Sequence, residues 1–331
     1  MARGWTPVAK WGLQLGVTQA PIFILTAPGL PGQTLAAMLA RGGAAYDVPE
    51  LNFLLAESIS GLMRDLVGIR AVQMHGILRT LAELLSGEQS QASVEMARRW
   101  MLRRGYQTSQ NAFDEVLGLV APRRLVMPLT APLFEGPTLA RLALTYPAAR
   151  YVRLLAHPHL YGRHVSVDIL AQVAMQLAGA MDSGERPAVP DPQSLWLLFD
   201  QAGDDLQDRL GKNQMVPLKI ESLLTEPEVA LAQLARDLDL PADAEAVARM
   251  MQPETSAFEG AGPMGASVQG AITSYAAMKK TLPDPAGSRL DGLMPWQLEG
   301  KPFSADTLAR AAAHGYVDAL PDLELASAEE T

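Results

Sequence analysis

The stretch "ILTAPGLPGQTLAAML" (residues 24–39) decides the fold, because it joins three kinds of local structure. The run "APIFIL" (residues 20–25) is short, apolar and rich in branched side chains, which predicts a buried strand. A tight turn of glycine and proline follows. "QTLAAMLAR" (residues 33–41) then predicts a helix that ends at Gly42 and Gly43.

The turn in this stretch partly matches the phosphate-loop pattern G-x-x-x-x-G-K-[ST]. Gly32 and Thr34 match the second glycine and the hydroxyl residue, whereas Ala27 replaces the first glycine and Gln33 replaces the lysine. Two interpretations stay open at this point. The amides from Gly32 to Leu35 hold an anion at the helix N-terminus, or the segment is an ordinary turn.

Further along the chain, strands alternate with helices. Apolar runs predict strands at residues 123–130, at residues 149–158 up to Pro158, and at the start of "MVPLKIESLL" (215–224), which then becomes a loop. Residues 55–120 show helical spacing throughout. The sequence therefore predicts an α/β fold with a P-loop-like parallel sheet flanked by helices, and a helical insertion after the first βα unit.

We expect one domain over residues 1–331, with an N-terminal arm (1–19) and a frayed acidic tail (322–331). Ligands bind at the carboxyl ends of parallel strands, so the loops after Leu25, Met127, Leu155 and Ile220 are expected on one functional rim.

Composition excludes several classes of function. With 27 basic and 36 acidic residues the net charge is −9, which argues against nucleic-acid binding. The chain has no cysteine, so disulfides and thiolate metal sites are excluded, and no metal site is expected. No apolar run reaches the ~18 residues of a membrane span, and the first residues lack the features of a signal peptide. We therefore expect a cytoplasmic protein that does not bind membranes.

Four segments beyond the loop carry a resemblance to a known family. They are, in order, "PELNFL", "YPAARYVRLLAHPHLYGRH", "VPLKIESLLTEPEVALAQLARDLDLP" and "AAAHGY". Together with the loop they resemble the sulfotransferases that use 3′-phosphoadenosine-5′-phosphosulfate (PAPS), and especially the bacterial branch that includes domains of polyketide synthases. The resemblance spans roughly residues 22–316.

The resemblance implies roles for individual residues. Gly32 and Thr34 fall on the family's loop glycine and threonine, and Gln33 falls on a serine or threonine. Glu50 matches the acid of the "PEL" segment, and Glu221 matches an acid that we expect to hold a loop through backbone amides. The expected cofactor-binding residues are Gly32, Gln33, Thr34, Leu35 and Arg163. The expected catalytic residues are Glu50, His157 and His164.

The family's cations are missing from this chain. Leu30 replaces the loop cation, Ala156 replaces the arginine that holds the 3′-phosphate, and Met127 with Pro128 replaces an Asp-Lys pair. His164 falls on a serine that binds the same phosphate. PAPS carries about four negative charges and needs fixed cations or many oriented donors. This loss argues against tight PAPS binding unless Arg163, His164 or Lys279 compensates.

Other residues keep two interpretations. The histidines of "AHPHLYGRH" form a site at the rim or lie on a surface loop. Glu50 is a catalytic base or an acid that favours a helix N-terminus, and His75 is a half-buried helix residue or a catalytic one. The basic run "RRWMLRRGY" (98–106) is a solvated helix face or a dock for an acidic acyl carrier protein.

Three functional hypotheses follow. The first is an enzyme of bacterial polyketide-type metabolism that transfers a sulfuryl group from PAPS to a hydroxyl. The second is a sulfotransferase-fold protein that has abandoned PAPS and acts on an apolar or carrier-tethered intermediate by acid–base chemistry. The third is a non-catalytic partner in a biosynthetic complex.

Overall fold

The computed structural model describes residues 19–182, 188–211, 213–267, 272–297 and 300–316. Five parallel strands form the central sheet in the order β2-β3-β1-β4-β7. The strands are β1 (Ile22–Leu25), β2 (Ala45–Asp47), β3 (Arg124–Leu129), β4 (Arg150–Leu155) and β7 (Met215–Lys219). The predicted fold class is confirmed.

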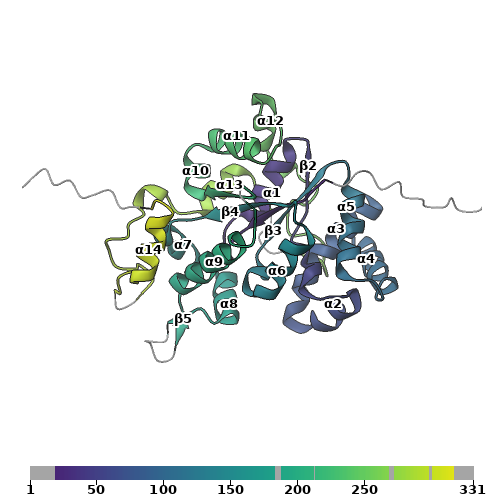
Figure 1. Ribbon diagram of the computed structural model, residues 1–331, viewed down its shortest axis with the longest axis horizontal. Coiled ribbons are helices and arrows are strands. Elements are labelled where there is room, and N and C mark those ends of the chain that lie inside the picture. The colour runs from purple at the N-terminus through teal and green to yellow at the C-terminus, as the bar shows by residue number, and fades with distance from the viewer. Residues whose placement is uncertain (1–18, 183–187, 212, 268–271, 298–299, 317–331) are drawn as a thin grey trace, which may run out of the picture.

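Helices cover both faces of the sheet (Figure 1). α1, α11 and α12 pack together on one side, while α6 and α9 contact each other on the other side. The α-helices of the α/β part are α1 (Gly32–Arg41), α6 (Gly136–Thr145), α7 (Pro158–Val165), α8 (Ile169–Ala178), α9 (Pro192–Gln207), α10 (Ile220–Thr225), α11 (Pro227–Asp237), α12 (Ala244–Met250), α13 (Tyr275–Thr281) and α14 (Ala305–Ala313).

The helical insertion predicted at residues 55–120 is present. Its members are α2 (Ile59–Asp65), η2 (Gly68–Met74), α3 (His75–Ser86), α4 (Gln91–Arg103) and α5 (Ser109–Val120). The short 3-10 turns elsewhere are η1 (Asn52–Leu55), η3 (Ala131–Phe134), η4 (Pro253–Thr255) and η5 (Pro285–Gly287), and β5 (Met181–Asp182) with β6 (Val189–Pro190) forms a two-stranded antiparallel pair.

Three predictions of local structure were wrong. The edge strand β2 was missed, because a strand of three residues gives too little periodicity. The segment after β4 is the helix α7 rather than a loop, since Pro158 occupies its first turn, where a missing amide costs nothing. The predicted loop after β7 is likewise the short helix α10.

The core explains why β1 decides the fold. All four β1 residues are fully buried between β3 and β4, and Phe23 packs against the rings of Phe113, Tyr146 and Tyr151. Because the sheet is parallel, the loops after β1, β3 and β4 lie at the same edge. That edge carries the site described below.

A buried ion network attaches α14 to the body of the domain. Asp200 on α9 is 1% exposed and accepts hydrogen bonds from Arg153 (2.6 Å), Arg310 (2.8 Å) and His314 (2.6 Å). Burial raises the pKa of Asp200, but the His314 hydrogen bond and the Arg153 and Arg310 cations together lower it by more. The net pKa of Asp200 is therefore below the usual value. The network holds the C-terminal part against the sheet.

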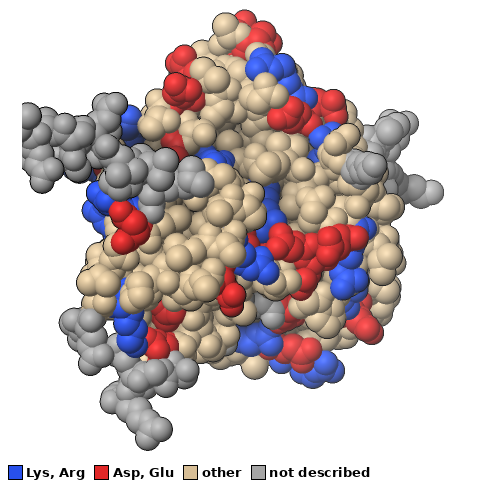
Figure 2. All heavy atoms as spheres, turned by 60° about the vertical axis from the view of Figure 1, so that its left-hand side comes forward, with Lys and Arg blue, Asp and Glu red and all other residues tan. Residues whose placement is uncertain are grey.

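Charges on the surface are mixed. On the face shown in Figure 2, acidic and basic groups lie beside one another, with broad uncharged areas between them. None of the helices in the described ranges is long and apolar enough to cross a membrane. The N-terminal arm, except for residue 19, and the tail predicted at residues 322–331 lie outside the described residues.

Candidate functional site

The loop after β1 folds tightly around Thr26. The Thr26 hydroxyl lies 3.4 Å from the Ala27 carbonyl and 3.5 Å from the Leu30 carbonyl. Gly29 has φ +87°, which favours glycine. A Cβ added at Gly32 would lie 2.5 Å from the Thr26 methyl group, so only glycine fits there. The glycines in the opening stretch are therefore required by the shape of the loop.

The first turn of α1 presents unused hydrogen-bond donors. Its N-cap, Pro31, makes no side-chain cap, and no acidic residue lies in the first turn. The amides of Gly32 and Leu35 donate within the loop, to Leu30 (2.9 Å) and Pro31 (3.0 Å). Within the described ranges the amides of Gln33 and Thr34 have no acceptor. Of the four amides predicted to hold an anion, two remain free to do so.

The Gln33 side chain adds another donor at the same place. The Gln33 residue is only 8% exposed, and its amide nitrogen Nε2 is buried. This nitrogen finds no hydrogen-bond acceptor in the part of the chain that the structure describes. A buried polar group without a partner typically costs about 1–3 kcal/mol. A ligand that accepted this hydrogen bond would remove that cost.

Glu50 follows β2 and lies beside the end of β3. Its Oε1 accepts hydrogen bonds from the backbone amides of Thr130 (2.5 Å) and Ala131 (2.9 Å). Burial raises the pKa of Glu50 above its usual value, while the two amides and Asn52 oppose that rise. The carboxyl is thus fixed in position and holds its proton more tightly than a carboxyl in water.

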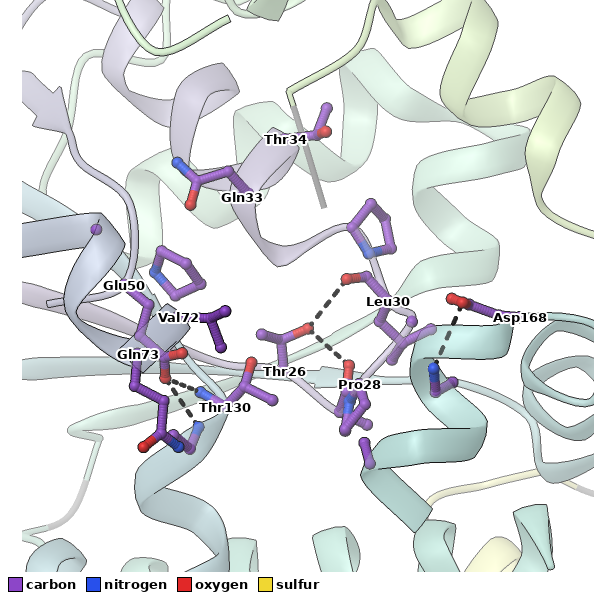
Figure 3. A pocket seen from close by; sticks show the side chains of 18 of the residues that line it. Thr26, Pro28, Leu30, Gln33, Thr34, Glu50, Val72, Gln73, Thr130 and Asp168 are labelled. Atoms are coloured by element: carbon purple, nitrogen blue, oxygen red, sulfur yellow. Dashed lines mark hydrogen bonds between the residues drawn. The ribbon is translucent and has the colours of Figure 1, made fainter. Parts of the chain in front are cut away.

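These groups line one cavity of about 750 Å³. That volume lies within the range of about 300–1,000 Å³ typical of small-molecule sites. Figure 3 shows Glu50, Gln73 and Thr130 at one side, Leu30 and Asp168 at the other, Thr26 between them, and Gln33 and Thr34 on the first turn of α1. The β1 loop and Glu50, predicted separately from the sequence, therefore meet in one pocket.

Only one of the predicted histidines reaches this pocket. His164, in the last turn of α7, lines it and donates from Nε2 to the Gly29 carbonyl at 2.9 Å, so it stabilises the loop. His157 is buried at the start of α7, where its ring nitrogen accepts from the His159 amide. Neither His157 nor the exposed Arg163 is among the residues that line the cavity.

Glu221 and His75 are not among the residues that line the cavity, and each bonds another part of the chain. Glu221 accepts from the His157 amide (2.7 Å) and from the Tyr316 hydroxyl (3.1 Å), as expected for an acid that holds a loop. His75 is half-buried at the start of α3, and its Nδ1 lies 2.7 Å from the Ser267 carbonyl. Both connect segments that are far apart in the sequence.

Several lining residues were missed from the sequence. Asn52 is 3% exposed with an unpartnered Oδ1, judged against the described residues, and Arg70 comes from η2. An apolar wall consists of Ala171, Ala174, Ala178, Met278 and Leu282. For the alanines of α8 the only sequence signal was their spacing of three and four, which any amphipathic helix shows.

Two solved structures resemble the chain over nearly their whole length. The sulfotransferase domain from the curacin biosynthetic pathway matches with a TM-score of 0.68 and 19% identity, over 90% of this chain and 98% of that one. The sulfotransferase domain from the Synechococcus PCC 7002 olefin synthase matches with a TM-score of 0.60 and 19% identity, over 93% and 99%. The chain has the sulfotransferase fold. No family model and no curated protein matches its sequence.

PAPS, which the resemblance implies, does not fit this sulfotransferase-fold pocket as a whole. The N-terminus of α1 suits one compact anionic group. At the expected 3′-phosphate position, Ala156 offers no cation and its carbonyl accepts from Trp196 at 2.9 Å. Among the described residues that line the pocket there is one arginine, Arg70, and it is paired with Glu135 at 3.2 Å. The two phosphate-bearing ends of PAPS would therefore share the one donor cluster that the described residues provide, at the N-terminus of α1.

Proposed function

We propose that the chain is an acid–base enzyme with the sulfotransferase fold that acts, without PAPS, on an apolar small molecule. The observation that carries the proposal is Glu50: a carboxyl fixed by two backbone amides, with a pKa raised by burial, at the wall of a large cavity. Perturbed carboxyls in clefts are typical of catalytic acids and bases.

Glu50 would act as the base. Its ionised carboxyl takes a proton from a C–H or O–H group of the substrate, and the electron pair of the broken bond stays on the substrate. The same carboxyl, now protonated, returns the proton to another substrate atom or to water. A positioned general base contributes typically about 10²–10⁴-fold in rate. The raised pKa brings the base nearer to neutral pH, where such transfer is most effective.

The comparisons support a setting for this chemistry. One neighbour belongs to the curacin biosynthetic pathway and the other to an olefin synthase. We propose a role in a polyketide-type pathway, with the substrate free or tethered to an acyl carrier protein. The basic segment at 98–106 stays a proposed dock, although Arg98, Arg99 and Arg104 already contact Gly265, Glu95 and Glu115.

The test follows proton exchange in heavy water. The chain is incubated with medium-chain 3-oxoacyl thioesters and ketones, and deuterium incorporation is measured by mass spectrometry beside Glu50→Gln. Glutamine keeps the acceptor oxygen for Thr130 and Ala131 but cannot accept the proton. We expect exchange by the wild type that Glu50→Gln lowers at least 100-fold. Equal exchange by both proteins, or none with the whole panel, would contradict the proposal.

Sulfuryl transfer from PAPS is the second candidate. The free amides of Gln33 and Thr34 at the N-terminus of α1 favour it, because they lie on the loop that the family resemblance assigns to the cofactor. Incubation with radiolabelled PAPS and a panel of apolar alcohols tests it. Labelled product would support this candidate over the first.

A further inference from the structure

The N-terminus of α1 lacks an acceptor for its donors. The Gln33 and Thr34 amides and the buried Gln33 Nε2 have none among the described residues, and the Thr34 hydroxyl, on a residue 2% exposed, has no hydrogen bond there either. Gln33 and Thr34 both line the cavity. A compact anion accepts several such hydrogen bonds at once and is favoured by the helix dipole.

The charges of the pocket limit such an anion to about one unit. Arg70 and Glu135 neutralise each other, and the remaining charged or titratable lining residues are Glu50, Asp168 and His164. His164 donates to Gly29, and Asp168 accepts from the Ala171 amide at 3.4 Å. With the two carboxyls nearby, every further negative charge on the ligand adds repulsion that no unpaired arginine among the described lining residues offsets.

An apolar part of the pocket wall comes from α8. Ala171, Ala174 and Ala178 are spaced by three and four residues, so they line one face of that helix, and Met278 and Leu282 extend the wall. An exposed apolar side chain, Ile69 (67% exposed), lines the cavity from η2. A straight apolar chain of the ligand would contact the alanine face of α8.

We infer that the pocket takes a linear apolar molecule that ends in one compact anionic group, a carboxylate or a sulfate ester. The anionic group lies at the N-terminus of α1, held by Gln33 and Thr34, and the chain runs along the alanine face of α8. This inference rests on the proposed function, for which it names the class of substrate.

Isothermal titration calorimetry with four ten-carbon ligands tests the head group. They are decanoate, decyl sulfate, decanol and decylamine, each kept below its micelle concentration. Hydrogen bonds to a charged group contribute about 1.5–3 kcal/mol, so one of the two anions should bind at least tenfold more tightly than decanol. Whichever of decanoate and decyl sulfate binds more tightly shows whether the head group of the ligand is a carboxylate or a sulfate ester. Decanol or decylamine binding as tightly as both anions would overturn the inference.

Three variants separate the head group from the chain. Gln33→Leu should weaken binding of the anion about tenfold and leave decanol unchanged. Ala174→Phe should weaken both ligands at least tenfold by filling the wall, while Val173→Phe, outside the cavity on the same helix, should weaken neither. Thermal unfolding confirms that each variant is folded. Unchanged anion binding by Gln33→Leu, or equal effects at positions 173 and 174, would contradict the placement.

Chain length supplies an independent readout. Each methylene buried on the apolar wall contributes about 0.8 kcal/mol, a roughly fourfold change in Kd. From hexanoate to decanoate the affinity should rise steadily by nearly this factor per carbon. A flat series would contradict the apolar wall. Because no turnover is involved, these results do not require proton transfer by Glu50: Glu50→Gln should lose proton exchange and bind the anion at least as tightly as the wild type, since it removes a nearby carboxylate.

Discussion

Gly76 tests the link between the helical insertion and Glu50. A Cβ added there would lie 2.1 Å from the Glu50 carbonyl oxygen, whereas ordinary contact begins near 3.4 Å. In Gly76→Ala the new Cβ would therefore lie about 1.3 Å too close to the Glu50 carbonyl oxygen. This oxygen belongs to the backbone, so it cannot rotate away as a flexible side chain can. Overpacking of this kind costs about 1–3 kcal/mol. Replacing glycine inside a helix returns about 1 kcal/mol, so we expect a net loss of up to about 2 kcal/mol in the free energy of unfolding.

Urea unfolding measures that loss, with Gly105→Ala as a control in the same insertion. A Cβ at Gly105 would meet the Leu102 carbonyl at 3.5 Å, an ordinary contact, so the control should unfold like the wild type. The Glu50 backbone should also shift by roughly 1 Å, and such a shift can lower activity about 100-fold. Stability and exchange rates for Gly76→Ala equal to those of Gly105→Ala would refute the reasoning.

Three further predictions concern the loop, the base and the ion network. In Gly32→Ala the new Cβ would lie 2.5–2.9 Å from Thr26 atoms. The variant should therefore lose about 1–3 kcal/mol in the free energy of unfolding, measured in urea, and bind decanoate more weakly. Stability and affinity equal to those of the wild type would contradict the tight packing of the loop. Glu50→Gln should be more stable than the wild type at neutral pH, because a raised pKa means that ionisation of Glu50 costs stability. The difference in the free energy of unfolding should shrink as pH falls toward 4.5, the usual pKa of a glutamate carboxyl. A difference that grows on acidification would contradict the prediction. Asp200→Asn should lower the free energy of unfolding by about 3–5 kcal/mol near neutral pH, because buried Arg153 loses a charged partner. Since the net pKa of Asp200 is lowered, the wild type should lose this advantage in stability as pH falls below about 4. A stability difference that does not depend on pH would contradict the assignment.

The sequence predicted those parts of the fold that depend on local patterns. β1 and α1 could be identified because a branched apolar run, a Gly-Pro turn and a helix ended by two glycines each leave a clear signal. The insertion was visible from its helical periodicity. β2 was not, since its three residues pair with β3 only through tertiary contacts.

The site was predicted in part for the same reason. Gln33, Thr34 and Glu50 could be named because they belong to recognisable segments. Their convergence could not, because it depends on how the insertion places Gly76 against the Glu50 backbone. His157 and Arg163 lie near the expected rim in sequence, but α7 directs them away from the cavity lining. The alanine face of α8 has no motif at all.

The central claim is that this sulfotransferase-fold pocket accepts one anionic group on an apolar chain in place of PAPS. Calorimetric titration with 3′,5′-adenosine bisphosphate, the nucleotide part of PAPS, tests it most directly. With one donor cluster at α1 and Arg70 paired to Glu135, we expect no heat of binding at millimolar nucleotide and no displacement of bound decanoate. Micromolar binding of the nucleotide, or its competition with decanoate, would contradict the account.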